Sequence, residues 1–406
     1  MRSLKYSAAI AAMCALMLTG CTENAEPNGG VSETGEYHVY SNGVLLESGA
    51  AYTDDGNFYV PDGMVTDYYS KYFFDDNEKK IYEETVENLN RLEETVPLPT
   101  DSSVYSKILK TIRLQQLSFS QLARRGVEYN PMVEYNPIKQ RFEVTFVYRF
   151  TAEEISEMNR ESEKAAKKIL AQLTPDMDDY EKLKFFHDYI ILNCENSTDD
   201  EYADTIYGAL VRGKALCEGY AKAFSYLCNL AGIENVIVTG DTGVAHMWNM
   251  VKLGGNWYHV DVTWDNPDDE LHKEFPDVIL YQYFMVTDSV IKNNHIIWSD
   301  PAEPPKAYGT EENYFVREGA DVTSSGDMLT AAENAIADAV KSGKRSAMIK
   351  FATTDLYLAA KSDLSNEELF LPVIERVKAE CGKSFELRWT PYYEQYRILT
   401  FIIDYN

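Results

Sequence analysis

The feature of this 406-residue sequence that most constrains its fold is a helix followed by a two-stranded hairpin, all within residues 213–264. Apolar residues recur at helical spacing, at Leu216, Tyr220, Ala223, Phe224, Leu227 and Ala231. Gly232 then stands where a left-handed residue ends a helix. Residues 244–253 and 257–264 read as strands on either side of the turn Gly254-Gly255-Asn256. A helix beside an antiparallel hairpin predicts an α+β fold.

Cys217 lies in the first turn of the predicted helix. The unpaired N–H groups and the helix dipole stabilise an anion there, so the sequence predicts a nucleophilic thiolate. Gly219 has no side chain, so another backbone segment or a substrate can approach closely. The competing interpretation is an inert core residue, which is the usual role of a cysteine on an amphipathic helix.

His246 and Asp261 fall on the two strands of the hairpin. In a hairpin whose loop has an even number of residues, the residue numbers of two directly paired residues add up to an odd number. The numbers 246 and 261 also add up to an odd number. The two side chains are then expected on one face, within reach of a hydrogen bond. The carboxylate would fix the imidazole tautomer and stabilise its charged form. A three-residue loop without a bulge would instead place them on opposite faces.

Three strings of residues carry a family resemblance: CEGYAKAF at 217–224, HMWNMV at 246–251 and WYHVDVTWDNP at 257–267. They resemble the transglutaminase-like superfamily, in its bacterial exported branch, and occur in the family's order of Cys, His and Asp. The resemblance covers about residues 178–300. It implies a papain-like core, in which a helix that bears Cys packs on an antiparallel sheet that bears His and Asp. It also implies three catalytic roles: Cys217 as nucleophile, His246 as base and Asp261 as the residue that orients the base.

The chemistry that this resemblance implies is acyl transfer from a peptide or protein amide through a thioester on the cysteine. The acyl group then passes to water, as in a peptidase or amidase, or to an amine, as in a cross-linking enzyme. We favour hydrolysis, because bacterial relatives are often proposed as peptidases and water is always present. A non-catalytic surface module that binds peptide or glycan stays open as an alternative. So does an N-terminal region that blocks the cleft until it is removed.

Other histidines and aromatic residues compete for roles in the site. His259 is the rival base, but it lacks the H-x-W-N context of His246 and is expected to be structural or to support the site from behind. His187 is expected to be a satisfied core or surface residue. Tyr207 is a candidate for the cleft lining and a weaker one for an oxyanion donor, a role for which the backbone N–H of Cys217 is preferred. The tryptophans at 248, 257 and 264 are expected in the core and cleft walls.

The remaining cysteines and acidic residues indicate no disulfide framework, metal or cofactor site. Cys194, Cys228 and Cys381 are widely spaced and have no motif around them, and no CxxC occurs. The acidic stretch Asp265, Asp268, Asp269 and Glu270 lacks the spacing of a calcium-binding loop and is expected to be solvated. Zinc held by Cys217, His246 and Asp261 would lack a supporting cysteine pair.

The first twenty residues read as a bacterial lipoprotein signal. A basic start is followed by a short apolar run that ends in Leu18-Thr19-Gly20-Cys21. Lipid is expected on Cys21, and residues 21–35 are expected to tether the protein to a bacterial membrane on its exported face. An ordinary cleaved signal with a chance cysteine is the alternative. A formal net charge of −27 argues against nucleic acid as a partner.

Three folded regions are expected after the tether. Residues 36–150 form an N-terminal α+β region, with a hairpin at 37–46, helices at 82–95 and 104–122 and a strand at 141–150. Residues 151–300 form the catalytic domain, which opens with a helix capped by Thr151 and a second helix at 180–193. Residues 301–312 are a proline-rich linker. Residues 313–406 form a small α+β domain, with helices at 327–341 and 366–379 and strands at 346–351, 385–389 and 396–405.

Overall fold

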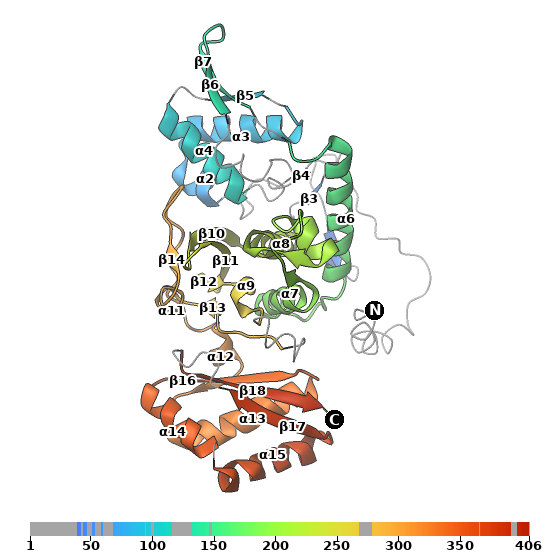
Figure 1. Cartoon of the computed structure of the whole chain (residues 1–406), viewed down its shortest axis with the longest axis vertical. Helices are drawn as coiled ribbons and strands as arrows, with labels where there is room; N and C mark the ends of the chain where they lie inside the picture. The colour runs from blue at the N-terminus through green and yellow to red at the C-terminus, as the bar shows by residue number, and fades with distance from the viewer. Residues whose placement is uncertain are drawn as a thin grey trace, which may run out of the picture.

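The protein is described as a computed structural model in which three groups of elements follow one another along the long axis (Figure 1). The described residues are 39–41, 44–46, 51–52, 58–59, 68–93, 95–98, 101–115, 132–145, 148–267, 278–364, 366–390 and 396–405. The predicted signal, the tether and Cys21 lie outside these residues. Among the described residues, no helix is both long and apolar enough to cross a bilayer.

A five-stranded antiparallel sheet forms the centre of the molecule, with the strand order β13-β12-β11-β10-β14. Its strands are β10 (Asn235–Asp241), β11 (Ala245–Leu253), β12 (Asn256–Val260), β13 (Phe284–Val286) and β14 (Ile296–Ile297). Helix α8 (Cys217–Leu230) packs on β10 and β11, and α7 (Asp179–Asn193) packs on α8 (Figure 1). The predicted α+β class, with the cysteine helix against an antiparallel sheet, is confirmed.

Helix α8 ends as the sequence predicts but is buried more completely. The N–H of Gly232, at φ +72°, bonds to Asn229 O, and the N–H of Ile233 bonds to Cys228 O, which is a Schellman ending. Every residue from 219 to 230 is buried, including Lys222 and Asn229. The predicted apolar positions Tyr220, Phe224 and Leu227 are buried, and the rest of these turns is buried too, because α7 and neighbouring segments also pack on α8.

The hairpin loop has two residues, Gly254 and Gly255, at φ +57° and +83°, and Leu253 pairs with Asn256. The loop is of even length, so the condition for placing His246 and Asp261 on one face is met. The predicted second strand is too long. It ends at Val260, and a short helix, α9 (Val262–Asp265), follows with Asp261 as its N-cap.

The N-terminal elements have a small core of their own, which includes Phe74, Tyr82, Ile108 and Val144. The hairpin predicted at residues 37–46 is present as β1 (Val39–Ser41) and β2 (Val44–Leu46), and β3 (Ala51–Tyr52) pairs with β4 (Phe58–Tyr59). The rest comprises α2 (Tyr68–Phe73), α3 (Asp76–Asn90), α4 (Ser102–Gln115) and a sheet of β5 (Thr95–Leu98), β7 (Arg141–Thr145) and β6 (Met132–Asn136).

The predicted helix at 82–95 begins earlier, because Asp75 and Glu78 form a capping box. The strand predicted at 141–150 is present as β7 over 141–145, and residues 146–147 lie outside the described part. The helix predicted at 104–122 begins at Ser102, and its residues after 115 lie outside the described part. This group contacts the centre through Tyr69 Oη, which donates to Ile237 O at 3.0 Å, and through Arg113, which lies 3.3 Å from Glu218.

Helix α6 (Ala152–Leu170) is capped by Thr151 as predicted and runs along the outside of the central group in Figure 1. A short connection leads from α7 to the cysteine helix. It consists of β8 (Glu195–Asn196), the π-helical turn η2 (Gly208–Arg212) and β9 (Lys214–Ala215), with β8 and β9 in parallel. Between β13 and β14 lies α11 (Asp288–Ile291), and the proline-rich segment follows β14. There Ala307 N donates to Asp288 Oδ1 at 3.0 Å.

The C-terminal elements form a four-stranded sheet with three longer helices. Its strand order is β15-β16-β18-β17. The elements are α12 (Tyr314–Arg317), β15 (Asp321–Val322), η3 (Ser325–Asp327), α13 (Met328–Lys341), β16 (Ser346–Phe351), α14 (Thr354–Leu364), α15 (Glu367–Cys381), β17 (Phe385–Thr390) and β18 (Ile398–Tyr405). The predicted helices and strands are present here, and α14 was not predicted. Tyr281 and Tyr314 stack with ring centroids 3.9 Å apart, which joins this group to the central core.

Candidate active site

Cys217 is the first residue of α8 and is partly exposed. The preceding residue, Leu216, fixes the start of the helix, because its N–H donates to Ala203 O at 2.8 Å. A Cβ added to Gly219 would lie 2.2 Å from that same carbonyl oxygen. The predicted close approach of another backbone segment at Gly219 is therefore present, and a glycine is required to place Cys217 here.

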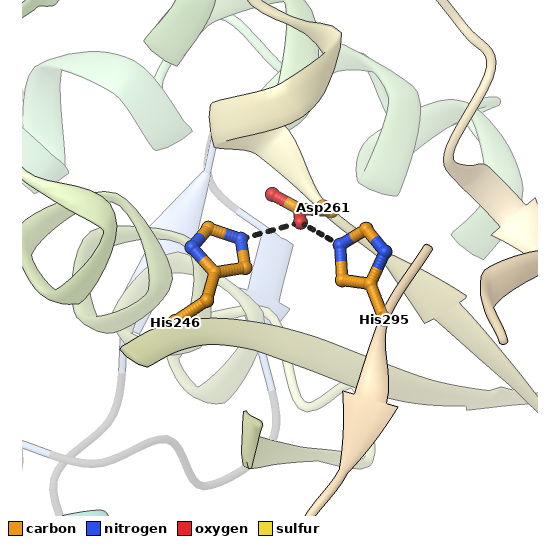
Figure 2. A group of neighbouring side chains, drawn as sticks. All are labelled: His246, Asp261 and His295. Atoms are coloured by element: carbon orange, nitrogen blue, oxygen red, sulfur yellow. Dashed lines mark hydrogen bonds and ion pairs between the residues drawn. The ribbon is translucent and has the colours of Figure 1, made fainter. Parts of the chain in front are cut away.

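His246 and Asp261 form a short hydrogen bond, with His246 Nε2 2.7 Å from Asp261 Oδ2 (Figure 2). The other carboxylate oxygen, Oδ1, accepts the N–H groups of Thr263 and Trp264, each at 3.1 Å. Both side chains are buried. Asp261 thus caps α9 and binds His246 at the same time, which fixes the orientation of the carboxylate.

Two hydrogen bonds fix the sheet and the α9 segment relative to the cysteine helix. Asn249 of β11 donates through Nδ2 to Ala221 O of α8 at 3.0 Å. Asn266, just after α9, donates through Nδ2 to Tyr220 Oη at 2.8 Å. The elements that carry His246 and Asp261 are therefore both attached to the first turns of α8. Both asparagines lie within the strings that carry the family resemblance.

His246 interacts with the Cys217 thiol as well as with Asp261. Burial by itself lowers the pKa of His246, but the charge and hydrogen bond of Asp261 and a hydrogen bond with Cys217 outweigh it, and the pKa rises to about 10. Nε2 of His246 faces Asp261, so Nδ1, which points away from the carboxylate in Figure 2, is the nitrogen open to another partner. His246 holds the pKa of Asp261 well below its usual range, against the effect of burial.

A second histidine, His295, binds the same carboxylate oxygen and was not predicted from the sequence. Its Nε2 lies 3.0 Å from Asp261 Oδ2 (Figure 2). Its Nδ1 lies 2.7 Å from Asn294 Oδ1. His295 is buried and directly precedes the edge strand β14. The surrounding sequence, NNHII, matches no motif, and only the pairing of β14 with β10 brings this residue to the site.

Aromatic rings surround the His246–Asp261 pair. Trp248 stacks on His246 with centroids 5.8 Å apart and is buried. Trp264 is half-buried and lies 6.1 Å from His246 and 4.8 Å from His295. The expected core and wall roles of these two tryptophans fit their positions. Trp257 is half-buried and lies against Tyr68 of α2. The apolar surroundings strengthen the interaction of the imidazole with the carboxylate, because they exclude water.

The other predicted histidines are satisfied elsewhere. His259 accepts a hydrogen bond from Trp248 Nε1 at its Nδ1 (3.0 Å), so its proton is on Nε2, which faces Asp288 Oδ1 at 3.1 Å. Both nitrogens are engaged, and burial lowers the pKa of His259. His187 is buried between Asp188 (3.0 Å) and Asp265 (3.3 Å). Neither residue reaches toward the sulfur.

Asp265 corrects the prediction of a solvated acidic stretch. It is fully buried, and its carboxylate accepts the N–H of Tyr283 at 2.9 Å besides facing His187. Burial raises the pKa of Asp265 to about 6. The prediction was wrong at this residue because α9 turns the chain back into the core. Asp268, Asp269 and Glu270 lie outside the described residues.

Tyr207 lies at the start of η2 with its ring 5.3 Å from that of Tyr202.

The four described cysteines, Cys194, Cys217, Cys228 and Cys381, are all free. Burial raises the pKa of Cys194 to about 12 and that of Cys228 far above its ordinary value. These two thiols are held neutral, as expected of inert core cysteines.

Within the described residues, His246, Asp261 and His295 are the group whose ligand atoms could converge on a metal ion, since those atoms all lie within 4.8 Å of one another. Both imidazoles already face the same carboxylate oxygen at hydrogen-bond distance. A metal ion would have to replace both of these hydrogen bonds. The group is therefore satisfied as a hydrogen-bonded network of two imidazoles on one carboxylate.

Comparisons with known proteins give one family model and two curated relatives that match part of the chain. Residues 166–262 match the model of the transglutaminase-like superfamily. Human kyphoscoliosis peptidase is 31% identical over 96 residues, which are 20% of this chain and 14% of that protein. The mouse protein of the same name is 39% identical over 64 residues, which are 13% of this chain and 10% of that protein. The chain thus spans about a seventh or less of the length of these relatives.

A solved structure described as a TGase is 14% identical and aligns over 45% of this chain and 55% of its own. The TM-score of that alignment is 0.25, which is too low to bear on the fold.

Proposed function

We propose that this chain, whose residues 166–262 belong to the transglutaminase-like superfamily, is a thiol enzyme that acts on peptide or protein amides through a thioester on Cys217. The observation that carries the proposal is that His246 pairs with Asp261 at 2.7 Å and also interacts with the Cys217 thiol. A nucleophile beside a base, with the base held by a third group, is the arrangement that activates a thiol.

In the proposed reaction, the thiol proton passes to Nδ1 of His246 and the sulfur attacks the amide carbonyl carbon. Asp261 stabilises the imidazolium that results, and the N–H groups of the first turn of α8 offer donors to the oxyanion. The C–N bond breaks as His246 gives its proton to the leaving amine, and the acyl group stays on the sulfur. His246 then takes a proton from water, which attacks the thioester and releases the acid and the thiol.

Hydrolysis is the proposed outcome of the second step. Water is always available, and the curated relatives are named peptidases. Acyl transfer to an amine would use the same first step and differ only in the nucleophile that accepts the acyl group. If the protein is instead a surface module that binds peptide without catalysis, no product forms through Cys217.

Mass spectrometry of a peptide library incubated with the protein separates these outcomes. With hydrolysis we expect new peptide termini or a gain of one mass unit from deamidation, and no change in the products when a primary amine is added. Adducts of the amine as main products would instead show a cross-linking enzyme. The Cys217→Ala variant provides the blank for both.

We also propose that lipid on Cys21 anchors the enzyme to a bacterial membrane on its exported face, as the signal at residues 1–20 indicates. The full chain, made in a bacterium that processes lipoproteins, is expected to enter the detergent phase on phase separation, and Cys21→Ala is expected to stay in the aqueous phase. Cys14→Ala is the matched control, since Cys14 leaves with the signal. Equal partition of the Cys21→Ala and unaltered proteins would contradict the anchor.

A further inference from the structure

Asp261 holds two imidazoles, and the proposed reaction uses only one of them. His246 Nε2 at 2.7 Å and His295 Nε2 at 3.0 Å converge on the same oxygen, Oδ2 (Figure 2). We propose that His295 is a positioning residue, which holds the Asp261 carboxylate in the orientation that aligns His246 with Cys217. This inference rests on the proposed function, because alignment matters only if His246 is the base.

Four donors surround the carboxylate of Asp261. Thr263 and Trp264 N–H groups occupy Oδ1, and the two imidazoles occupy Oδ2. Asp261 is fully buried, so a lost donor cannot be replaced by bulk water. During turnover His246 passes its Nδ1 proton back and forth, and its hold on Oδ2 weakens whenever the ring is neutral. His295 is then the side chain that keeps Oδ2 in place.

The ring of His295 is itself oriented from behind. Its Nδ1 faces Asn294 Oδ1 at 2.7 Å, and Asn294 Nδ2 donates to Tyr283 Oη at 2.6 Å. Tyr283 Oη lies 3.2 Å from Tyr396 Oη, which belongs to the C-terminal elements. Trp264 packs on the ring with a centroid distance of 4.8 Å. A continuous line of polar contacts thus joins the C-terminal group to His295.

His295 does not qualify as a second base. Its Nε2 points at the carboxylate and its Nδ1 at an asparagine oxygen, so neither nitrogen is directed at a reacting atom. The titratable groups that face His246 are Cys217 on α8, Asp261 before α9 and His295 before β14. Asp265 of α9 adds a further carboxyl near Asp261. Without the His295 donor, the negative charge on Oδ2 is shared with one imidazole fewer. It then interacts more strongly with His246, so His246 should bind its proton more tightly.

Two substitutions in the full chain test the role of His295. In His295→Gln the amide nitrogen replaces Nε2 and can donate to Asp261, whereas in His295→Asn the shorter amide lies near the place of Nδ1 and falls short. We expect His295→Asn to lower the alkylation rate of Cys217 at neutral pH and the turnover number by about tenfold, the value of one hydrogen bond to a charged group, with KM unchanged. We expect the alkylation rate and turnover number of His295→Gln to stay within about threefold of those of the unaltered protein, because its amide keeps the hydrogen bond to Asp261.

A spectroscopic readout separates positioning from general stability. In histidine-labelled protein, the NMR titration midpoint of His246 should move upward in His295→Asn and return in His295→Gln. Tyr405→Phe is the matched control: it removes a hydrogen bond to Lys344 O within the C-terminal elements, outside the active site, and should lower stability without moving that midpoint. Tyr396→Phe should act in the same direction as His295→Asn but by only about two- to threefold, as a lost neutral hydrogen bond does.

Equal rates and equal His246 midpoints in His295→Asn and the unaltered protein would overturn the inference. Equal losses in the Asn and Gln variants would also overturn it, because only one of them lacks the donor. The proposed function fails by a different result, in which Cys217 of the unaltered protein reacts no faster than Cys381. The two failures are therefore distinguishable in the same set of samples.

Discussion

Replacing Asp261 by asparagine is expected to lower kcat/KM by roughly 10³- to 10⁴-fold and to shift the pH profile. The charge of Asp261 raises the pKa of His246 to about 10 against the effect of burial, so the imidazole keeps its proton up to that pH. Without that charge, the effect of burial is opposed mainly by Cys217, and the pKa of His246 falls. The alkaline limb of activity should therefore move from near pH 10 to a lower pH, as measured by rates on a cleaved peptide across pH 5–11.

Asp288→Asn is the matched control for Asp261→Asn. Asp288 also faces a buried histidine, His259, at 3.1 Å, but it does not contact His246. This variant should lose stability and keep the alkaline limb of the unaltered enzyme. If the alkaline limb of the pH–activity profile of Asp261→Asn stays near pH 10, that result would contradict the assigned role of Asp261, whatever the reaction rate of the variant.

Replacing Cys217 by alanine is expected to lower turnover by roughly 10⁵- to 10⁶-fold, as the loss of a covalent nucleophile does. The fold should be kept, because Cys217 is partly exposed and the start of α8 is fixed by Leu216 and Gly219. Circular dichroism and thermal melting check the fold, and product formation from a cleaved peptide gives the rate. Residual turnover above about a hundredth of the original would contradict the covalent mechanism.

Cys381→Ala is the control for this experiment. Cys381 is also partly exposed and free, and it lies at the end of α15 among the C-terminal elements. Its Sγ contacts Ala337 O at 3.8 Å and no residue of the proposed site. We expect full activity from Cys381→Ala, since neither charge nor hydrogen bonding at the site changes.

The sequence was sufficient for the parts of the site that depend on local chemistry. A cysteine at a helix start, a glycine that admits a carbonyl oxygen, and two glycines in a hairpin loop each leave a local signature. The odd-sum argument placed His246 and Asp261 on one face because the loop has two residues. It did not show that Asp261 ends the strand, since its capping of α9 depends on where β12 stops pairing.

His295 and Asp265 could not be assigned from the sequence because tertiary contacts decide both. His295 reaches Asp261 only because β14 pairs with β10, more than fifty residues earlier in the chain. Asp265 appeared to begin a solvated acidic stretch, but α9 returns it to the core beside His187. The full burial of α8 has the same origin, since its outer face is covered by α7.

The rate at which each cysteine reacts with iodoacetamide at neutral pH, resolved by mass spectrometry, tests most directly whether Cys217 and His246 act as a pair. Cys217 is expected to react at least about tenfold faster than Cys381, and His246→Ala should remove that advantage. Cys194 and Cys228 should stay unlabelled in the folded protein, because both are buried. Equal and slow labelling of Cys217 and Cys381, unchanged in His246→Ala, would contradict the account.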